Sequence, residues 1–310
     1  MVEDTAGGSV GHAERMRAAA ARAGGSGKPS RGRLVLEHVH KHFGKGKASA
    51  PVVHDVSLSC SPGEFVVVVG PSGCGKTTIL NVAAGMISPD AGKAMLDGKP
   101  IKGPGPERAM VFQDHGLFPW LTAEQNIEFG LKMAGVSRGE RWDRVNAALK
   151  MVHLTHSGKK LVHELSGGMR QRVAIARSLV VDPAVLLMDE PFAAHDAQTR
   201  TLLHEQLQEL WIETRKTILF VTHSVGEAVR LADRIIVLHA HPGRIRREVV
   251  VDLPHARNFD SPSISELVSL VRREIEDEVN RINAQVDGDH WKPETRGDLA
   301  ADSVGMGGGI

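Results

Sequence analysis

A glycine-rich stretch that ends in a lysine and a threonine has the clearest chemistry in this sequence. It reads Gly70-Pro-Ser-Gly-Cys-Gly-Lys-Thr77 and fits the pattern G-x-x-x-x-G-K-[ST] at every fixed position. Glycines allow the backbone to curl so that successive N–H groups point at one anion, and a helix N-terminus behind them adds the positive end of its dipole. The stretch therefore predicts a nucleotide-binding loop, made of Gly70, Pro71, Ser72, Gly73, Cys74, Gly75, Lys76, Thr77 and Thr78.

Two side chains of this loop have separate tasks. Lys76 can reach the β- and γ-phosphates as a mobile charge, and the hydroxyl of Thr77 is placed to bind Mg²⁺. The alternative is a glycine-rich turn that fits the pattern by chance. That alternative is disfavoured because the loop lies between the apolar run Val66–Val69 and a helix predicted from Thr77 to Ala84.

Three more polar side chains follow apolar runs further along the chain. Asp189 and Glu190 end one run, and His223 follows another. The carboxylate of Asp189 suits Mg²⁺, which prefers oxygen ligands, and Glu190 can accept a proton from an attacking water. His223 can hold the γ-phosphate through a hydrogen bond. Each residue is weak evidence alone, since acids and histidines are common in surface loops.

The elements that must position these residues are apolar strands that alternate with helices. Such a pattern indicates a mainly parallel sheet with both faces covered, and ligands bind such sheets beyond the carboxyl ends of the strands. Gln113, like the residues above, follows a predicted strand. One site can therefore contain the loop that begins at Gly70 together with Gln113, Asp189 and His223.

The remaining elements follow from periodicity. Strands are predicted at about 34–40, 52–58, 66–69, 93–96, 111–113, 185–190, 218–221, 235–238 and 247–251. Helical spacing is present at 77–84, 122–152, 169–180, 197–214 and 263–282. Residues 1–30 and 285–310 have few large apolar side chains, which predicts a disordered tail at each end.

Composition excludes several classes of protein. The net charge of +1 over 310 residues gives no reason to expect binding to nucleic acid or to a bare lipid surface. No apolar run approaches the roughly 18 residues that span a bilayer, so we expect any membrane association to depend on a protein partner. The two cysteines, Cys60 and Cys74, favour a reducing compartment. Cys74 is either a reactive thiol at a helix N-terminus or, as we favour, a small filler in the loop.

The motif Leu165-Ser-Gly-Gly-Met-Arg-Gln-Arg172 distinguishes this chain from phosphate-loop kinases and small GTPases, which lack it. Together with the nucleotide loop, Gln113, Asp189-Glu190, Ala193-Ala-His-Asp196 and His223, it resembles the ATPase subunit of an ABC transporter over about residues 32–253. The resemblance implies an α/β fold of the P-loop NTPase type. This fold has a mainly parallel sheet, an antiparallel β subdomain and an inserted helical subdomain at about 115–180. The ATPase domain would cover 31–255, with a helical extension at 256–284.

The resemblance also implies residue roles. Phe43 matches the aromatic residue that stacks on adenine, and Gln113 matches the residue that contacts Mg²⁺ and senses the membrane partner. Residues of the 165–172 motif and Asp196 match positions that act on ATP bound to the opposite subunit, so each site is completed only in a head-to-tail dimer. These residues are Ser166, Gly167, Gly168 and Asp196.

The subfamily is indicated by three details: Met169 in the motif, Phe118-Pro-Trp-Leu121, and Pro242-Gly-Arg-Ile245. They resemble the ATPases of nitrate, sulfonate and taurine importers. This implies an ATP hydrolase that uses Mg²⁺ and dimerises with a second copy of itself. It would drive a separate permease fed by an extracytoplasmic solute-binding protein, as a peripheral protein on the cytoplasmic face of the inner membrane. The alternatives are an ABC ATPase that acts on nucleic acid or ribosomes, and the ATPase of an exporter or another transporter subfamily.

Two positions carry further expectations. Trp120 lies in an apolar loop that we expect to dock on a permease helix, the alternative being that it packs onto the helical subdomain. His195 stands where the family usually has Leu. It is expected to lie close to the phosphate loop of the partner subunit, or simply to fill the space of that Leu.

Overall fold

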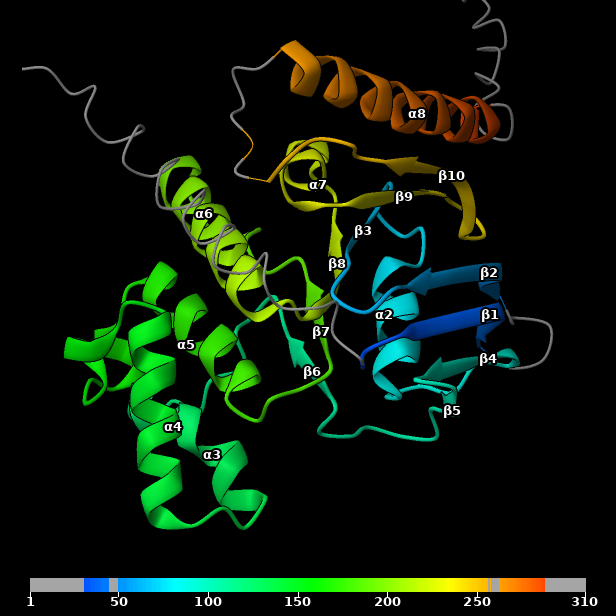
Figure 1. Ribbon diagram of the computed structural model, residues 1–310. Coiled ribbons are helices and arrows are strands. Elements are labelled where there is room, and N and C mark those ends of the chain that lie inside the picture. The colour runs from blue at the N-terminus through cyan, green and yellow to red at the C-terminus, as the bar shows by residue number, and fades with distance from the viewer. Residues whose placement is uncertain (1–30, 45–49, 256, 258–261, 288–310) are drawn as a thin grey trace, which may run out of the picture.

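The computed structural model describes residues 31–44, 50–255, 257 and 262–287 (Figure 1). The predicted tail at 1–30 lies outside the described residues. The same holds for residues 288–310 of the predicted C-terminal tail, whereas residues 285–287 belong to helix α8, which spans Pro262–Asp287.

A six-stranded sheet forms the centre of the molecule, in the order β10-β9-β3-β8-β7-β6. Its strands are parallel except β10, which pairs antiparallel to β9 at the sheet edge. The mainly parallel α/β sheet is therefore confirmed. The strand bounds are β3 Phe65–Val69, β6 Arg108–Val111, β7 Val185–Asp189, β8 Thr217–Thr222, β9 Arg234–His239 and β10 Arg244–Val250.

Burial on both faces explains why the central strands are continuously apolar. In β3, Phe65, Val67 and Val69 belong to a core shared with the helices α5 (Gly167–Leu179), α6 (Ala197–Thr214), α7 (Val225–Leu231) and α8 (Pro262–Asp287). The intervening residues Val66 and Val68 belong to a second core, which contains helix α2 (Lys76–Ala84) and the antiparallel sheet. The alternating side chains of one strand thus hold two layers together.

The second sheet is antiparallel, in the order β2-β1-β4-β5. It confirms the antiparallel β subdomain. Helix α2 packs beside it, and Figure 1 shows this helix between the two sheets. β5 has no counterpart among the predicted strands, because two residues are too few to show an alternating pattern. The bounds are β1 Leu34–Phe43, β2 Ala50–Cys60, β4 Ala91–Leu96 and β5 Lys99–Pro100.

Three helices form a lobe that projects away from the sheets (Figure 1). They are α3 Ala123–Met133, α4 Arg138–Met151 and α5 Gly167–Leu179. Each begins at a side chain that accepts a backbone hydrogen bond, namely Thr122, Ser137 or Ser166. Such caps satisfy amide groups that have no partner within the helix. The helical segment predicted between 122 and 152 is thus two helices with a break at residues 134–137.

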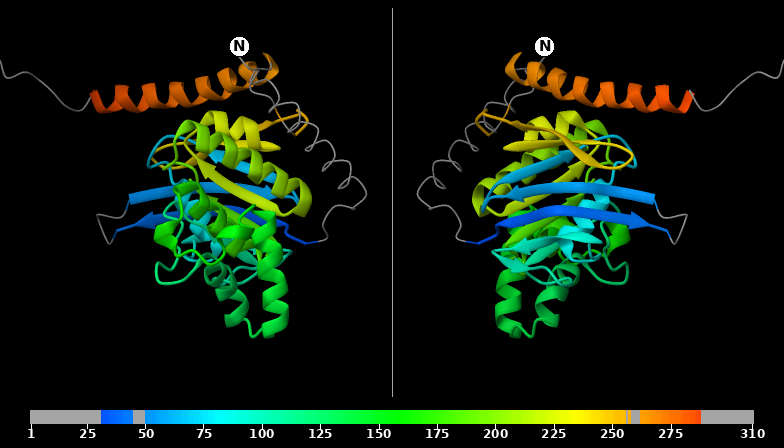
Figure 2. Two further views of the ribbon diagram at one scale, coloured as in Figure 1. Left: turned by 90° about the vertical axis from the view of Figure 1, so that its left-hand side faces the viewer. Right: turned by 90° about the vertical axis from the view of Figure 1, so that its right-hand side faces the viewer.

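The other helices are α6 Ala197–Thr214, α7 Val225–Leu231 and α8 Pro262–Asp287. The short α7 is missing from the predicted elements, because seven residues show too little of the helical period. α8 lies across the molecule beside β10 in both views of Figure 2. Glu274 of α8 accepts hydrogen bonds from Arg246 and Arg247 of β10, at 2.6 and 2.5 Å. In the described part of the chain, no helix has the length and apolar character needed to cross a bilayer.

Candidate nucleotide-binding site

The predicted phosphate loop follows β3 and leads into α2. Gly73 and Gly75 have φ values of +76° and +89°, a region that favours glycine. A Cβ on Gly75 would also lie 2.9 Å from a methyl group of Val53. Lys76 is buried, and its ammonium donates hydrogen bonds of 2.9 Å to the carbonyl oxygens of Gly70 and Pro71. The lysine therefore lies folded over the loop.

The register of the sheet brings the candidate polar residues to one edge. Val69, which precedes the loop, pairs with Thr222, which precedes His223. Val221 pairs in turn with Asp189 at the end of β7. The loop, the acidic pair and the histidine therefore leave neighbouring strands at the same level, as the sequence predicts.

Thr77 and Asp189 are in contact at this edge. The Thr77 hydroxyl donates a hydrogen bond of 3.1 Å to Oδ1 of Asp189. Burial raises the pKa of Asp189, and the hydrogen bond from Thr77 offsets only part of this effect. A nearby cation would favour the ionised carboxylate. A hydroxyl and a carboxylate are also the oxygen donors that Mg²⁺ prefers, so the pair fits a magnesium ion.

Glu190 and His223 form a second contact. Nδ1 of His223 lies 2.8 Å from Oε2 of Glu190. The backbone of Glu190 has a φ of +43°, and its N–H donates to the carbonyl of Val221 at 3.0 Å. The neighbouring strand thus holds the backbone of Glu190, and the carboxylate contacts an imidazole that is itself exposed, with 60% of its side chain accessible. Such an acceptor beside the phosphate loop can take a proton from water.

Gln113 and Phe43 are both exposed. Gln113 lies in the turn after β6, at the sheet edge that also carries Asp189, since β6 and β7 are parallel neighbours. Phe43 ends β1 with 46% of its surface accessible, and the ammonium of Lys41 lies 5.7 Å from its ring centroid. A free aromatic face is what stacking on a base requires.

The residues expected to act on a second subunit lie at the first turns of α5 and α6. Ser166 caps α5 and accepts a hydrogen bond of 3.3 Å from the N–H of Met169. Asp196 caps α6 and accepts from Gln198 and Thr199 at 3.0 Å each. The bonds from Thr199 hold the pKa of Asp196 below its usual value. A Cβ on Gly168 would lie 3.0 Å from a methyl group of Thr199, so the two helix starts are packed against each other.

The turn between β9 and β10 supports the phosphate loop from behind. A Cβ on Gly243 would lie 2.1 Å from the carbonyl oxygen of Cys74. The backbone of Gly243 is fixed to β2, since its N–H donates to Val52 and its carbonyl accepts from His54, each at 2.9 Å. In the sequence, Gly243 is recognisable only as part of the subfamily marker at 242–245, and its contact with the loop was not predicted. The Pro242-Gly243 pair predicts a turn, but the sequence does not show which segment this turn contacts.

Cys74 is a structural part of the loop. Its side chain is buried, and burial raises the pKa of its thiol. A Cβ on Gly70 would lie 2.8 Å from the Cys74 sulfur, so the thiol fills the space inside the curl. A buried thiol with a raised pKa is unreactive, which favours the filler over the reactive cysteine.

Comparison with known proteins identifies the family. A model of the ABC transporter family matches residues 53–193. The aliphatic sulfonates import ATP-binding protein SsuB of Bacillus licheniformis is 45% identical over 245 residues, which are 78% of this chain and 94% of the relative. This chain belongs to the family of ABC transporter ATP-binding proteins.

Other ABC transporter ATP-binding proteins are similarly close. The nitrate import ATP-binding protein NrtD of Synechocystis is 46% identical over 221 residues, which are 71% of this chain and 83% of that one. The taurine import ATP-binding protein TauB of Mesorhizobium japonicum is 48% identical over 214 residues, which are 69% of this chain and 82% of that protein. The resemblance to importer ATPases of the nitrate, sulfonate and taurine group is confirmed.

The fold agrees with solved ABC cassettes. The dimeric post-hydrolysis structure of the cassette MJ0796, bound to ADP and Pi, has a TM-score of 0.62 and 32% identity. The match covers 71% of this chain and all of that one. The present ABC protein is thus an ATP-binding ATPase with the predicted cassette fold.

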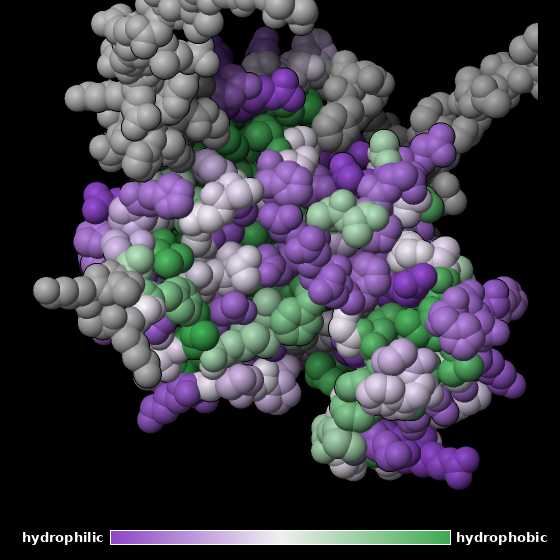
Figure 3. Space-filling model, turned by 180° about the vertical axis from the view of Figure 1, so that it is seen from behind, coloured by the Kyte–Doolittle hydropathy of each residue, from purple (hydrophilic) through white to green (hydrophobic). Residues whose placement is uncertain are grey.

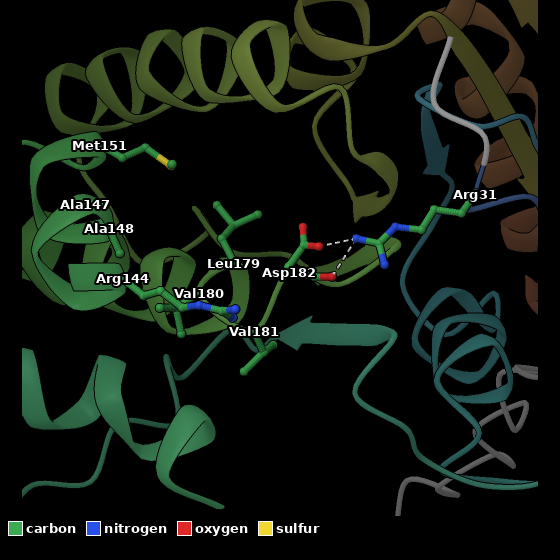
Figure 4. Close-up of a pocket in the computed structure, with 9 residues that line it drawn as sticks. All are labelled: Arg31, Arg144, Ala147, Ala148, Met151, Leu179, Val180, Val181 and Asp182. Atoms are coloured by element: carbon green, nitrogen blue, oxygen red, sulfur yellow. Dashed lines mark hydrogen bonds and ion pairs between the residues drawn. The ribbon is translucent and has the colours of Figure 1, made fainter. Parts of the chain in front are cut away.

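The ABC protein also has a pocket of about 510 Å³ outside the nucleotide site (Figure 4). It lies between α4 and the end of α5, with an apolar wall that includes Met151 and Leu179. Asp182 lines it and accepts hydrogen bonds from Arg31 and, at 2.5 Å, from Lys216. Its carboxylate is thus already paired, and none of the predicted nucleotide-binding residues lines the pocket.

Proposed function

We propose that this ABC ATPase hydrolyses MgATP at the edge of the parallel sheet to drive uptake of a small anionic solute, of the nitrate, sulfonate or taurine type, through a separate permease. The observation that carries the proposal is the pairing of Glu190 with His223 directly beside the Thr77–Asp189 contact. The named activities of SsuB, NrtD and TauB support the importer class.

The residues of the site divide the work of hydrolysis. The loop N–H groups and Lys76 bind the phosphates, and the lysine exchanges its bonds to loop carbonyls for bonds to phosphate oxygens. Thr77, Asp189 and Gln113 would hold Mg²⁺, which would supply positive charge close to the phosphates. Phe43 stacks on the adenine.

Glu190 is the proton acceptor for the attacking water. His223 bonds to Oε2 of Glu190 and leaves Oε1 of that carboxylate available for the water. The imidazole also lies where it can donate to a γ-phosphate oxygen, since its strand ends beside the phosphate loop. The two residues thereby orient the nucleophile and the phosphate with respect to each other.

A second copy of the chain completes each site. The first turns of α5 and α6 carry Ser166, Gly167 and Asp196, which are exposed, and Gly168, which is partly buried. The helix start of α5 has N–H groups that attract an anion, which suits the γ-phosphate of ATP held by the partner. The dimeric cassettes among the solved relatives support this arrangement.

The permease binds to an apolar cluster on the helical lobe. We define this cluster as Phe118, Trp120 and Phe129. The ring centroids of Phe118 and Phe129 lie 4.6 Å apart, whereas 71% of Trp120 is exposed. Figure 3 shows apolar surface on this protruding lobe. A membrane partner at this cluster would hold the ATPase at the cytoplasmic face of the inner membrane, with the solute-binding protein on the opposite side.

The variant Glu190→Gln tests the proposal. It keeps the shape of the side chain but cannot accept a proton, so we expect kcat to fall by about 10²–10⁴-fold while MgATP still binds. With hydrolysis blocked, an ATP-bound dimer should accumulate in size-exclusion chromatography with light scattering. Glu266→Gln, an exposed glutamate of α8, is the matched control. A Glu190→Gln protein with ordinary turnover, or one that stays monomeric at saturating ATP, contradicts the proposal.

A further inference from the structure

Two histidine rings lie against each other between the turns that carry Gln113 and Asp196. The ring centroids of His115 and His195 are 5.8 Å apart, and the planes are inclined by 29°, which is a stacked arrangement. His195 is buried, with 8% of its surface accessible, and His115 is partly buried. The predicted alternative that His195 fills space inside its own chain thus agrees with its burial.

The His195 ring also touches the start of helix α5, which carries Ser166, Gly167 and Gly168, here called the signature residues. A Cβ on Gly167 would lie 3.6 Å from Nε2 of His195. The ring therefore has His115 on one side and the backbone of Gly167 on another. This single side chain joins three segments: the turn after β6, the turn before α6, and the first turn of α5.

Both turns are anchored to the helices through their backbones. Arg177 of α5 donates a hydrogen bond of 3.0 Å to the carbonyl of His115. Arg200 of α6 donates one of 2.7 Å to the carbonyl of His195. A displacement of either turn must therefore move a ring, a helix or both.

The two histidines contact each other by packing of their rings and not by a hydrogen bond. Nδ1 of His115 and Nδ1 of His195 are both buried and have no hydrogen-bond partner among the described residues. The contact between the two turns at this point is therefore made by the stacked ring faces.

We propose that His115 and His195 are a positioning pair that fixes the Gln113 turn against the Asp196 turn and the start of α5. This inference rests on the proposed function, in which Gln113 acts on the nucleotide of its own subunit and the signature residues act on that of the partner. The stacked rings couple these two surfaces, so ATP bound in one site sets the position of the groups that complete the other. Neither residue touches the nucleotide.

A double-mutant cycle on the full chain tests the pair. His115→Asn removes one ring while tolerating the φ of +60° at that position, and His195→Leu removes the other ring while keeping an apolar filler. We expect each single variant to lower kcat about fivefold, the rate equivalent of the ~1 kcal/mol found for aromatic pairs. KM for ATP should change less than about twofold, since the phosphate loop is untouched.

The double variant should be no slower than the slower single variant, because the ring contact is lost only once. His195→Phe restores a ring at this position and should recover most of the rate. Unchanged thermal midpoints and nucleotide binding in all variants exclude simple misfolding. Losses that multiply in the double variant, or a His195→Phe protein as slow as His195→Leu, would overturn the pairing.

The outcome is distinct from that of the proposed function. In a Glu190→Gln background, the proposed function requires an ATP-dependent dimer whatever stands at positions 115 and 195. The measured quantity is the ATP concentration at which half of the protein is dimeric. If the two histidines act as a pair, His115→Asn, His195→Leu and the double variant should all raise this concentration by the same factor. If the dimer forms but the effects of the two substitutions on this ATP concentration multiply in the double variant, only the pairing is refuted. If the Glu190→Gln parent forms no dimer, the shared site is refuted.

Discussion

At the scale of single residues, the nucleotide site depends on positions where no larger side chain fits. Gly243 is the clearest case, because its α-carbon faces the carbonyl oxygen of Cys74 and its φ lies in the ordinary range. The contact supports the loop whose N–H groups must point at the phosphates. Steric room, rather than backbone flexibility, therefore requires glycine at this position.

Gly243→Ala should disturb the phosphate loop. A methyl group 2.1 Å from the Cys74 oxygen must push the loop or the β9–β10 turn aside. We expect kcat/KM for ATP to fall by about ten- to a hundredfold, as for other small displacements of binding groups. Steady-state ATPase kinetics measure the effect. Gly139→Ala, at a glycine with open space around it, is the control, and equal kinetics for both variants would rule out the supporting role.

At the scale of elements, the proposed function gives the helical lobe surfaces for two different partners. Its helix α5 begins with the signature residues, while α3 and the loop before it carry the apolar cluster. The lobe has a shared core with the main sheet, which includes Ile127 of α3 and Val173 of α5. Because packed interiors transmit displacement, a force at the cluster can reach the signature residues.

Trp120→Ala should weaken binding to the membrane partner. The side chain is 71% exposed and does not contribute to the nucleotide site, so the ATPase rate of the isolated chain should be nearly unchanged. We expect a smaller fraction of tagged protein in the membrane pellet of the native host. Val250→Ala is the control, because this residue is 72% exposed but lies on β10. Equal loss of ATPase activity and membrane retention would instead indicate that Trp120 stabilises the lobe.

At the scale of the whole molecule, the half-buried carboxylate of Asp233 connects segments that are far apart in sequence. Asp233 accepts hydrogen bonds from the N–H of Phe65 in β3 and from Nε2 of His255, at 2.9 and 2.7 Å. Burial raises the pKa of Asp233, but these two bonds outweigh it, and the net shift is downward. The folded state therefore favours the ionised carboxylate.

This shift predicts a loss of stability in acid. The contribution of Asp233 is complete above the ordinary aspartate pKa of about 4, and it disappears as the pH falls through the lower folded-state value. The thermal midpoint should fall between about pH 5 and pH 3, and Asp233→Asn should show a smaller fall over that range. Calorimetry at several pH values measures this, with Asp252→Asn as the exposed control. Parallel curves for Asp233→Asn and the parent protein would refute the assignment.

The sequence by itself determined the nucleotide loop, the parallel sheet and the acidic pair. These features have local signals: fixed spacing in the 70–77 loop, continuously apolar strands, and polar residues placed directly after them. Because parallel strands end at a common edge, the grouping of Asp189, Glu190 and His223 could be predicted without coordinates.

Only the tertiary structure decided the contacts between residues that are distant in sequence and have no repeating pattern. The support of Cys74 by Gly243 and the stacking of His115 on His195 depend on how separate turns pack. For Trp120 the sequence allowed two interpretations, since an apolar residue in a loop can pack inward or face a partner. Packing is a property of the whole chain, so no local spacing encodes it.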